Sequence, residues 1–398
     1  MSDAAAPRTN FLIVFTIWGA GLGAAAQFAK ISVIFAPMAR DYGGAAATSW
    51  LVSVVGIVGL IFGTTAGLLV VRLGPRRVLV GGLMLGAALS AFQAGMPGYG
   101  WMLASRVAEG ASQLAIVVAG PVLIAEVTAP RHNGFAMSLW ASFFGVSFAA
   151  SALIAPVLVA AFGIAGLFAA HAAYMAVFAA LLWPMLPADH SADRPAAAPW
   201  PRPREGLLAQ HLAIYRSPFV AAPAAGFVFY TLMFVALVTL MPLQMPPALH
   251  GWVSEGMPLI AIAVSLTLGV QILRWLSAVR LVQLGFALAA VAALSLWLVW
   301  GEGAAMTVAL LALAGSLGLV QGGSFAAIAE LNRTSEDRAR AAGAIAQLGN
   351  LGTATGTPLL TALIAGQAAT GVLVFSVPLC LGGLAAHQWM AWRRTRGH

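Results

Sequence analysis

Three charged residues stand in stretches that are otherwise apolar, and their types suit the handling of a proton or a charged solute. Lys30 is the single lysine of the chain and lies in an apolar stretch from about Phe11 to Pro37. Arg106 and Glu109 lie three residues apart, a spacing that puts both on one helical face where they can pair. A charge at bilayer depth costs about 3 kcal/mol or more, so such groups are usually paired or part of a pathway.

Simpler interpretations of these charges stay open. Lys30 lies about 20 residues, hence about 30 Å, from the start of its stretch, so its ammonium could simply snorkel to the outer surface. Arg106 and Glu109 could form a purely structural ion pair. Gln27 shares a face with Lys30 and Gln113 extends the face of Glu109, so we include both glutamines among the candidate pathway residues.

Polar residues also occur at membrane depth in the second half of the chain. Our candidates there are Tyr230, Gln321, Gln347 and Asn350. Each of them, taken alone, is more often a packing or interhelical contact than a ligand group. His171 could titrate near neutral pH, but a lone histidine does not by itself establish proton coupling.

The composition places these residues in a membrane. The 398 residues are 61% hydrophobic and only 8% charged, which leaves too little polar surface for a soluble domain. A hydrocarbon core of about 30 Å needs about 20 apolar residues per helix, so the chain has room for about twelve crossings. Helices satisfy their own backbone hydrogen bonds within the bilayer. We therefore expect an all-α integral membrane protein.

Hydropathy divides the chain into two sets of six apolar segments. The stretch between the sets is polar and rich in proline, so we expect an N-terminal six-helix bundle at 1–186, a cytoplasmic linker at 187–216 and a C-terminal six-helix bundle at 217–398. A weak repeat of short motifs suggests that the two bundles are pseudo-symmetric. The twelve transmembrane helices are predicted at 11–37, 46–70, 78–96, 101–127, 134–160, 163–186, 217–243, 256–273, 281–300, 305–331, 341–366 and 369–391.

The arginines predict the orientation. With these segments, 17 of the 19 arginines fall in loops on the side of the N-terminus, and only Arg40 falls in a loop on the other side. Cationic loops are retained in the cytoplasm, so both termini are expected there. One helix too many or too few would have destroyed this asymmetry, which supports the count of twelve. The Ala, Gly and Arg bias suggests a bacterial source and hence the cytoplasmic membrane.

Two motifs carry a resemblance to a known family. The loop after the second segment runs from Gly67 to Arg77, and it resembles the signature loop of the major facilitator superfamily (MFS). Val71 stands where that family usually has an aspartate, and Pro75 where it often has an arginine. Residues 106–110, Arg-Val-Ala-Glu-Gly, are similar to the arginine motif of many proton-coupled members. The matching loop residues are Gly67, Arg72, Gly74, Arg76 and Arg77.

The resemblance implies the MFS fold of two six-helix bundles and secondary transport by alternating access. In the family the loop acts as a cytoplasmic latch through its aspartate, which Val71 replaces here. We expect proton coupling with Glu109 as the protonated group. The excess of buried cations favours a small organic anion as substrate, and drug efflux is the alternative within the family. A channel or a membrane receptor is the alternative from another class.

Small residues and missing motifs complete the expectations. Gly59, Gly63 and Gly67, together with the glycines of 349–358, are expected to form sliding seams between the halves, or simply tight packing. The sequence holds no nucleotide-binding loop, zinc-binding helix or hydrolase elbow, so we expect no enzyme, no cofactor and no metal. The net charge of +8 reports topology rather than a nucleic-acid partner. The expected partners are a small solute, protons and lipid, with the protein as a monomer.

Overall fold

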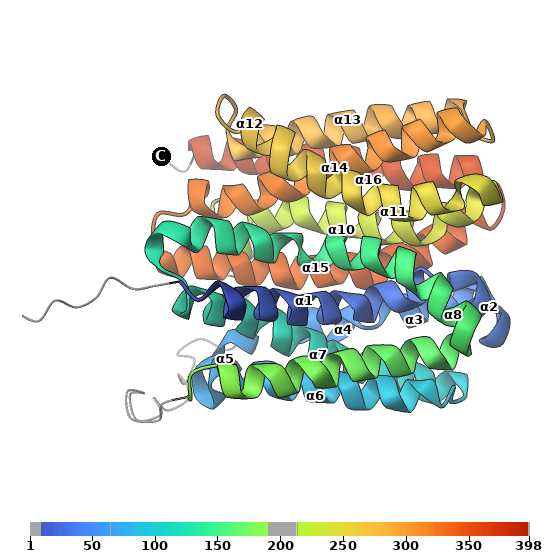
Figure 1. Ribbon diagram of the computed structural model, residues 1–398. Helices are drawn as coiled ribbons and strands as arrows, with labels where there is room; N and C mark the ends of the chain where they lie inside the picture. Colours follow the sequence, from blue (N-terminus) through green and yellow to red (C-terminus); the bar gives the residue numbers. More distant parts are fainter. Residues whose placement is uncertain (1–8, 64, 190–211, 213, 397–398) are drawn as a thin grey trace, which may run out of the picture.

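The chain folds into helices that run side by side in two groups (Figure 1). The computed structural model describes residues 9–63, 65–189, 212 and 214–396, and within these ranges it contains no strand. The first group consists of α1 (Phe11–Ser32), α2 (Phe35–Asp41), α3 (Ala45–Ser53), α4 (Gly56–Phe62), α5 (Ala66–Leu73), α6 (Pro75–Ala94), α7 (Tyr99–Glu126), the short η1 (Pro130–His132) and α8 (Asn133–Met185). The second consists of α10 (Ala222–Leu240), η2 (Pro242–Gln244), α11 (Pro247–Val264), the π-helical η3 (Ser265–Gly269), α12 (Val270–Ile272), α13 (Ala278–Leu298), α14 (Gly303–Leu331), α15 (Ser335–Ile364) and α16 (Ala368–Arg396).

Short polar residues and prolines set where several helices begin. The side chain of Asn10 accepts a hydrogen bond from the backbone of Ile13 at the start of α1, and Ser277 and Thr334 cap α13 and α15 in the same way. Such caps satisfy backbone N–H groups that have no partner inside the helix. Pro75 and Pro247 open α6 and α11, where the missing N–H of proline costs nothing.

Each predicted segment corresponds to a helix or to a run of helices. The first, 11–37, is α1 and part of α2, and the second, 46–70, is divided into α3, α4 and part of α5. The fifth and sixth, 134–160 and 163–186, form α8, which breaks at Gly163 with a φ of 69°. That angle lies in the left-handed region, which glycine adopts at little cost.

Several predicted boundaries were wrong. α11 begins at Pro247 rather than at 256, because its first turns carry polar residues such as His250 and Glu255 that hide the start of the helix. α15 begins at Ser335 rather than at 341, since Thr334 caps it. The first part of the signature loop is also helical, because α5 continues to Leu73.

The lengths and composition of the helices fit a multi-pass membrane protein. Among the described residues, nine helices are long and apolar enough to cross a bilayer, or ten if α3 and α4, bent by 41°, form one span. The predicted twelve fits if α8 is counted as two crossings and α15 is added. α15 itself is less apolar than the other long helices, because Gln347, Asn350 and several glycines and threonines dilute its apolar residues.

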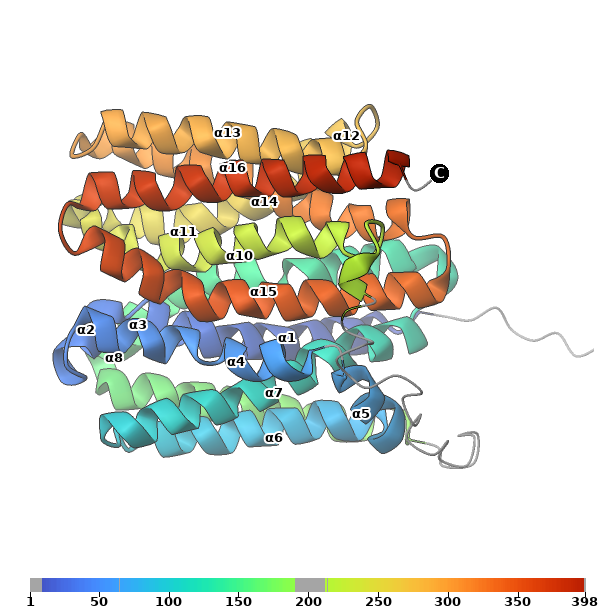
Figure 2. The same cartoon turned by 180° about the vertical axis from the view of Figure 1, so that it is seen from behind.

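The two groups contact each other along several helices. α15 packs against α3 and α4, and α8 packs against α11. Figure 2 shows α15 lying beside α4 when the molecule is seen from behind. The start of α1, the end of α16 and the junction of α5 with α6 lie at one end of the molecule, which we call the terminal end. α2 lies at the opposite end, which we call the α2 end.

The apolar core differs between the two ends. One continuous cluster, which we call the shared core, includes Phe28, Met38 and Leu51 of the first group together with Met233 and Met257 of the second. The other clusters each belong to a single group and lie toward the terminal end. Among the described residues, the halves therefore share apolar packing toward the α2 end and keep separate cores toward the terminal end.

Candidate functional site

Lys30, Arg106 and Glu109 meet in one buried cluster inside the first group. The Lys30 Nζ lies 2.5 Å from Oε1 of Glu109, and Nη1 of Arg106 donates to Oε2 of the same carboxylate. The side chains are 2%, 0% and 0% exposed. Lys30 therefore does not snorkel to the surface, and Arg106 and Glu109 are not an isolated pair.

Polar side chains of α6 complete the first ring of contacts around this cluster. The Lys30 ammonium donates to the hydroxyl of Ser90 at 2.8 Å and to Oε1 of Gln93 at 2.9 Å. The amide of Gln93 in turn donates to Oε2 of Glu109 at 3.0 Å. The ring of Phe168 lies 5.1 Å from the ammonium, close enough for a cation–π contact. The ammonium and the carboxylate thus both have several partners, which lowers the cost of burying them.

His171, in the part of α8 that follows the break at Gly163, also belongs to the cluster. Its Nδ1 lies 2.7 Å from the Ser90 hydroxyl and 3.5 Å from the Lys30 ammonium, and its Nε2 lies 3.0 Å from the carbonyl of Gly23. The sequence did not reveal this role, because a single histidine carries no spacing signal. The helix packing brings it to the depth of Lys30 and Glu109.

Arg106 also fastens neighbouring helices to α7. Its Nε donates to the carbonyl of Leu51 at 2.9 Å, near the end of α3, where helix carbonyls lack partners within the helix. Its Nη2 donates to the carbonyl of Gln27 in α1. The side chain of Gln27 continues the network by donating to Ser112 at 2.8 Å. The guanidinium is therefore committed to the protein itself, unlike a group held open for a solute.

The position and charge of the cluster limit what it can do. Glu109 lies ten residues after Tyr99, the first residue of α7, hence about 15 Å along the helix, which is half the thickness of a hydrocarbon core of about 30 Å. When all three groups are ionised, one carboxylate faces the two cations of Lys30 and Arg106. Glu109 and His171 are the members that can accept a proton when the others are ionised. The cluster can therefore exchange protons and hold an additional negative charge.

The other candidates lie outside this cluster. Tyr230 is buried in α10, where it stacks on Phe234 with ring centroids 5.2 Å apart. Gln321 is half-buried in α14. Gln113 is buried, and its Oε1 has no hydrogen-bond partner in the described part of the chain. The predicted pathway residues thus do not form one site.

Gln347 and Asn350 instead line the seam where α15 meets α4. The amide of Gln347 donates to the carbonyl of Leu60 in the other group at 2.9 Å, and its Oε1 accepts from Tyr215 at 2.7 Å. Burial raises the pKa of Tyr215 to about 12, so its hydroxyl keeps the proton that it donates. A Cβ at Gly59 would lie 2.3 Å from Nδ2 of Asn350, so the seam needs glycine there. The expectation of a glycine seam between the halves holds at this position.

The signature loop has a carboxylate that its own sequence lacks. The carboxylate of Asp189, at the start of the predicted linker, accepts the backbone N–H groups of Arg76 and Arg77 at 3.2 and 3.1 Å. Both N–H groups belong to the first turn of α6, where an anion is also favoured by the helix dipole. The guanidinium of Arg76 stacks on Trp183 at 4.2 Å. Asp189 therefore holds the loop at the place where Val71 offers no acid.

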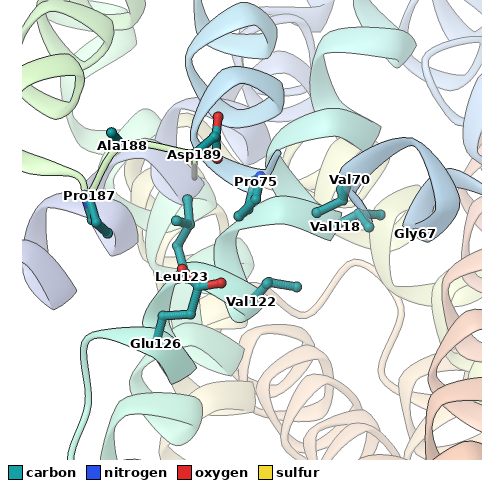
Figure 3. A pocket seen from close by; sticks show the side chains of 10 residues that line it. All are labelled: Gly67, Val70, Pro75, Val118, Val122, Leu123, Glu126, Pro187, Ala188 and Asp189. Carbon is teal, nitrogen blue, oxygen red and sulfur yellow. The ribbon is translucent and has the colours of Figure 1, made fainter. Parts of the chain in front are cut away.

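A cavity at the terminal end is lined in part by the signature loop, including Gly67. Figure 3 shows Pro75 beside Asp189 and Gly67 near Val70 and Val118, with Glu126 among the other lining residues. Its volume is about 450 Å³. Gly74 is the N-cap of α6, and Arg72 is exposed. Residues 190–211 and 213 of the predicted linker lie outside the described residues.

Comparison with known proteins identifies the family. The family model described as Major Facilitator Superfamily matches residues 13–357, which is most of the chain. The chain belongs to the Major Facilitator Superfamily. It is a multi-pass membrane transporter with a small-molecule substrate, and transporters of this superfamily are generally not enzymes. The comparison with curated proteins finds no match.

Proposed function

We propose that this MFS protein is a secondary transporter that works by alternating access and couples solute movement to protons through Glu109. The observation that carries the proposal is the buried cluster of Lys30, Arg106 and Glu109 near the predicted middle of the bilayer. Removing one partner of such a buried pair costs about 3–5 kcal/mol, so the cluster is expensive to change without compensation. A proton on the carboxylate is such a change.

The charge balance supports a small organic anion as the solute. A proton on Glu109 releases Lys30 from its 2.5 Å contact and leaves two buried cations without an anion. A solute carboxylate can then replace the lost charge at Lys30, whereas Arg106 stays bound to backbone carbonyls. Proton and anion would thus bind together. A ligand shifts a conformational equilibrium only through its different affinity for the two states, and this exchange provides that difference.

The contacts between the groups support a rocking movement. α15 meets α4 through Gly59 and the amides of Gln347 and Asn350. Close backbone contacts of this kind suit helices that separate and meet again. Because the arginine-rich loops are expected in the cytoplasm, we propose that the terminal end faces the cytoplasm of a bacterial cell and the α2 end faces outward.

A transport assay in proteoliposomes tests the proposal. Purified protein is reconstituted, a pH gradient is imposed, and uptake is measured for a panel of monocarboxylates, dicarboxylates and cationic dyes. We expect saturable, gradient-driven uptake of a carboxylate that Glu109→Gln abolishes and that Glu302→Gln, at an exposed position, leaves intact. Carboxylate uptake that is indifferent to the pH gradient would refute proton coupling.

Drug efflux is the second candidate, supported by the aromatic residues of α10. Phe227, Tyr230 and Phe234 pack in series, with ring centroids 5.3 and 5.2 Å apart. Tyr230 and Phe234 are buried in the shared core, so an amphiphilic molecule would meet these rings when the halves separate. In the same assay, dye movement that depends on the gradient would favour efflux over anion transport. Counterflow distinguishes either carrier from a channel, which would give a current that does not saturate.

A further inference from the structure

The hydroxyl of Ser90 lies between two groups that can accept its hydrogen. Its Oγ is 2.7 Å from Nδ1 of His171 and 3.3 Å from Oε1 of Glu109. Ser90 and Glu109 are fully buried, and His171 is 7% exposed. A hydroxyl has a single hydrogen, so Ser90 can donate to His171 or to Glu109 but not to both.

A backbone carbonyl of α1 sets whether the Ser90 hydroxyl donates to His171 or to Glu109. Nε2 of His171 lies 3.0 Å from the carbonyl of Gly23, which can only accept a hydrogen bond. The neutral ring therefore carries its hydrogen on Nε2, and Nδ1 accepts from Ser90. In the protonated ring, Nδ1 also carries a hydrogen and donates to Ser90. The hydroxyl hydrogen then turns to Glu109.

We propose that His171 is a second proton-holding residue of this transporter, and that Ser90 passes its protonation state to Glu109. The proposal deepens the proton coupling proposed above and rests on it. In the transfer, Nδ1 of His171 gives its proton to Ser90 Oγ, while the Ser90 hydrogen moves to Oε1 of Glu109. The products are a neutral imidazole, an unchanged serine and a carboxylic acid, so protons and charge balance.

The neighbouring charges set when this transfer can occur. The groups that face His171 are Lys30 of α1 at 3.5 Å, Ser90 of α6, and Glu109 with its partner Arg106 on α7. A protonated ring and the Lys30 ammonium would compete for one carboxylate. His171 therefore takes up its proton when the Lys30 ammonium leaves Glu109 and binds a solute anion. The added proton and the added anion cancel, so the net charge of the cluster stays the same. This exchange couples one proton to one monovalent anion.

Spectroscopy on the full-length protein in nanodiscs tests the relay without any solute. The ¹⁵N shifts of His171, identified as those lost in His171→Gln, report its tautomer and charge across pH. The infrared band lost in Glu109→Gln reports the carboxylate. We expect the Nε2–H tautomer at high pH, and on acidification a Glu109 band that shifts with the same midpoint as His171. In Ser90→Ala the band should no longer follow His171, and Ser90→Thr, which keeps the hydroxyl, should restore the link.

Three results would overturn the relay: an Nδ1–H tautomer, a ring that stays neutral wherever Glu109 changes, or a Glu109 band that still follows His171 in Ser90→Ala. Transport separates this failure from that of the proposed function. We expect Ser90→Ala to lose gradient-driven carboxylate uptake by about tenfold or more, which corresponds to one hydrogen bond to a charged group. If the wild type shows no gradient-driven uptake, proton coupling itself fails. If it does, and Ser90→Ala keeps the same pH profile, only the relay fails.

Discussion

Neutralising Glu109 should destabilise the protein strongly, because it strands two buried cations. Glu109→Gln keeps the shape of the side chain but removes the only carboxylate that contacts Lys30 and Arg106 among the described residues. Breaking a buried ion pair by removing one partner costs about 3–5 kcal/mol. For a bundle of this size, 1 kcal/mol corresponds to about 2–4 °C, so we expect the melting temperature to fall by about 10 °C.

A double-mutant cycle shows whether the charges are the reason. Lys30→Met removes one cation, so the variant carrying both changes should recover part of the stability that Glu109→Gln loses. Contacting residues typically give interaction energies of about 0.5–3 kcal/mol in such cycles. Thermal unfolding in detergent can be followed by the fluorescence of the 12 tryptophans.

A matched control uses the same chemical change at the surface. Glu302 is exposed and makes no side-chain cap contact, so Glu302→Gln should shift stability by less than about 1 kcal/mol. If Glu109→Gln proves as stable as this control, or if the Lys30→Met change fails to rescue it, the cluster is not held by its charges and our reasoning is refuted.

Three further tests address other parts of the structure. Gly59→Ala should reduce transport several-fold because its methyl group meets Asn350. Gly81→Ala, at an exposed position of α6 with open space around it, should not, and equal rates for the two variants in an uptake assay would contradict the seam. Asp189→Ala should lower stability by about 1 kcal/mol through loss of the α6 cap, and Asp189→Asn by less; thermal unfolding measures both. Gly163→Ala should cost about 1 kcal/mol in the same measurement because of its positive φ, and an unchanged melting temperature would argue against the break in α8.

Features that depend on composition and helical spacing could be predicted from the sequence. The apolar segments and the pairing of Arg106 with Glu109 follow from hydropathy and from an i, i+3 spacing. The signature loop and the arginine motif pointed to the family that the comparison confirmed. Lys30 was singled out by its rarity, and the structure places it against Glu109.

Features that depend on how helices pack could not be read in this way. His171 and Ser90 come from α8 and α6, and only the packing of these helices puts them 2.7 Å apart. Asp189 reaches α6 from more than one hundred residues away, so the sequence of the loop could not show its partner. Tyr230 and Gln321 looked like pathway residues because they are polar at membrane depth, yet they lie apart from the buried charges.

Because the shared core lies toward the α2 end, the free energy needed to separate the two halves differs between the two ends of the molecule. At about 25 cal/mol for each Å² of apolar surface, prising apart the α2 end exposes to water the continuous packing between residues such as Met38 and Met257. Toward the terminal end each half has its own apolar core, so separating the halves there exposes less apolar surface to water. We therefore expect the two halves to separate at the terminal end at a lower free-energy cost than at the α2 end.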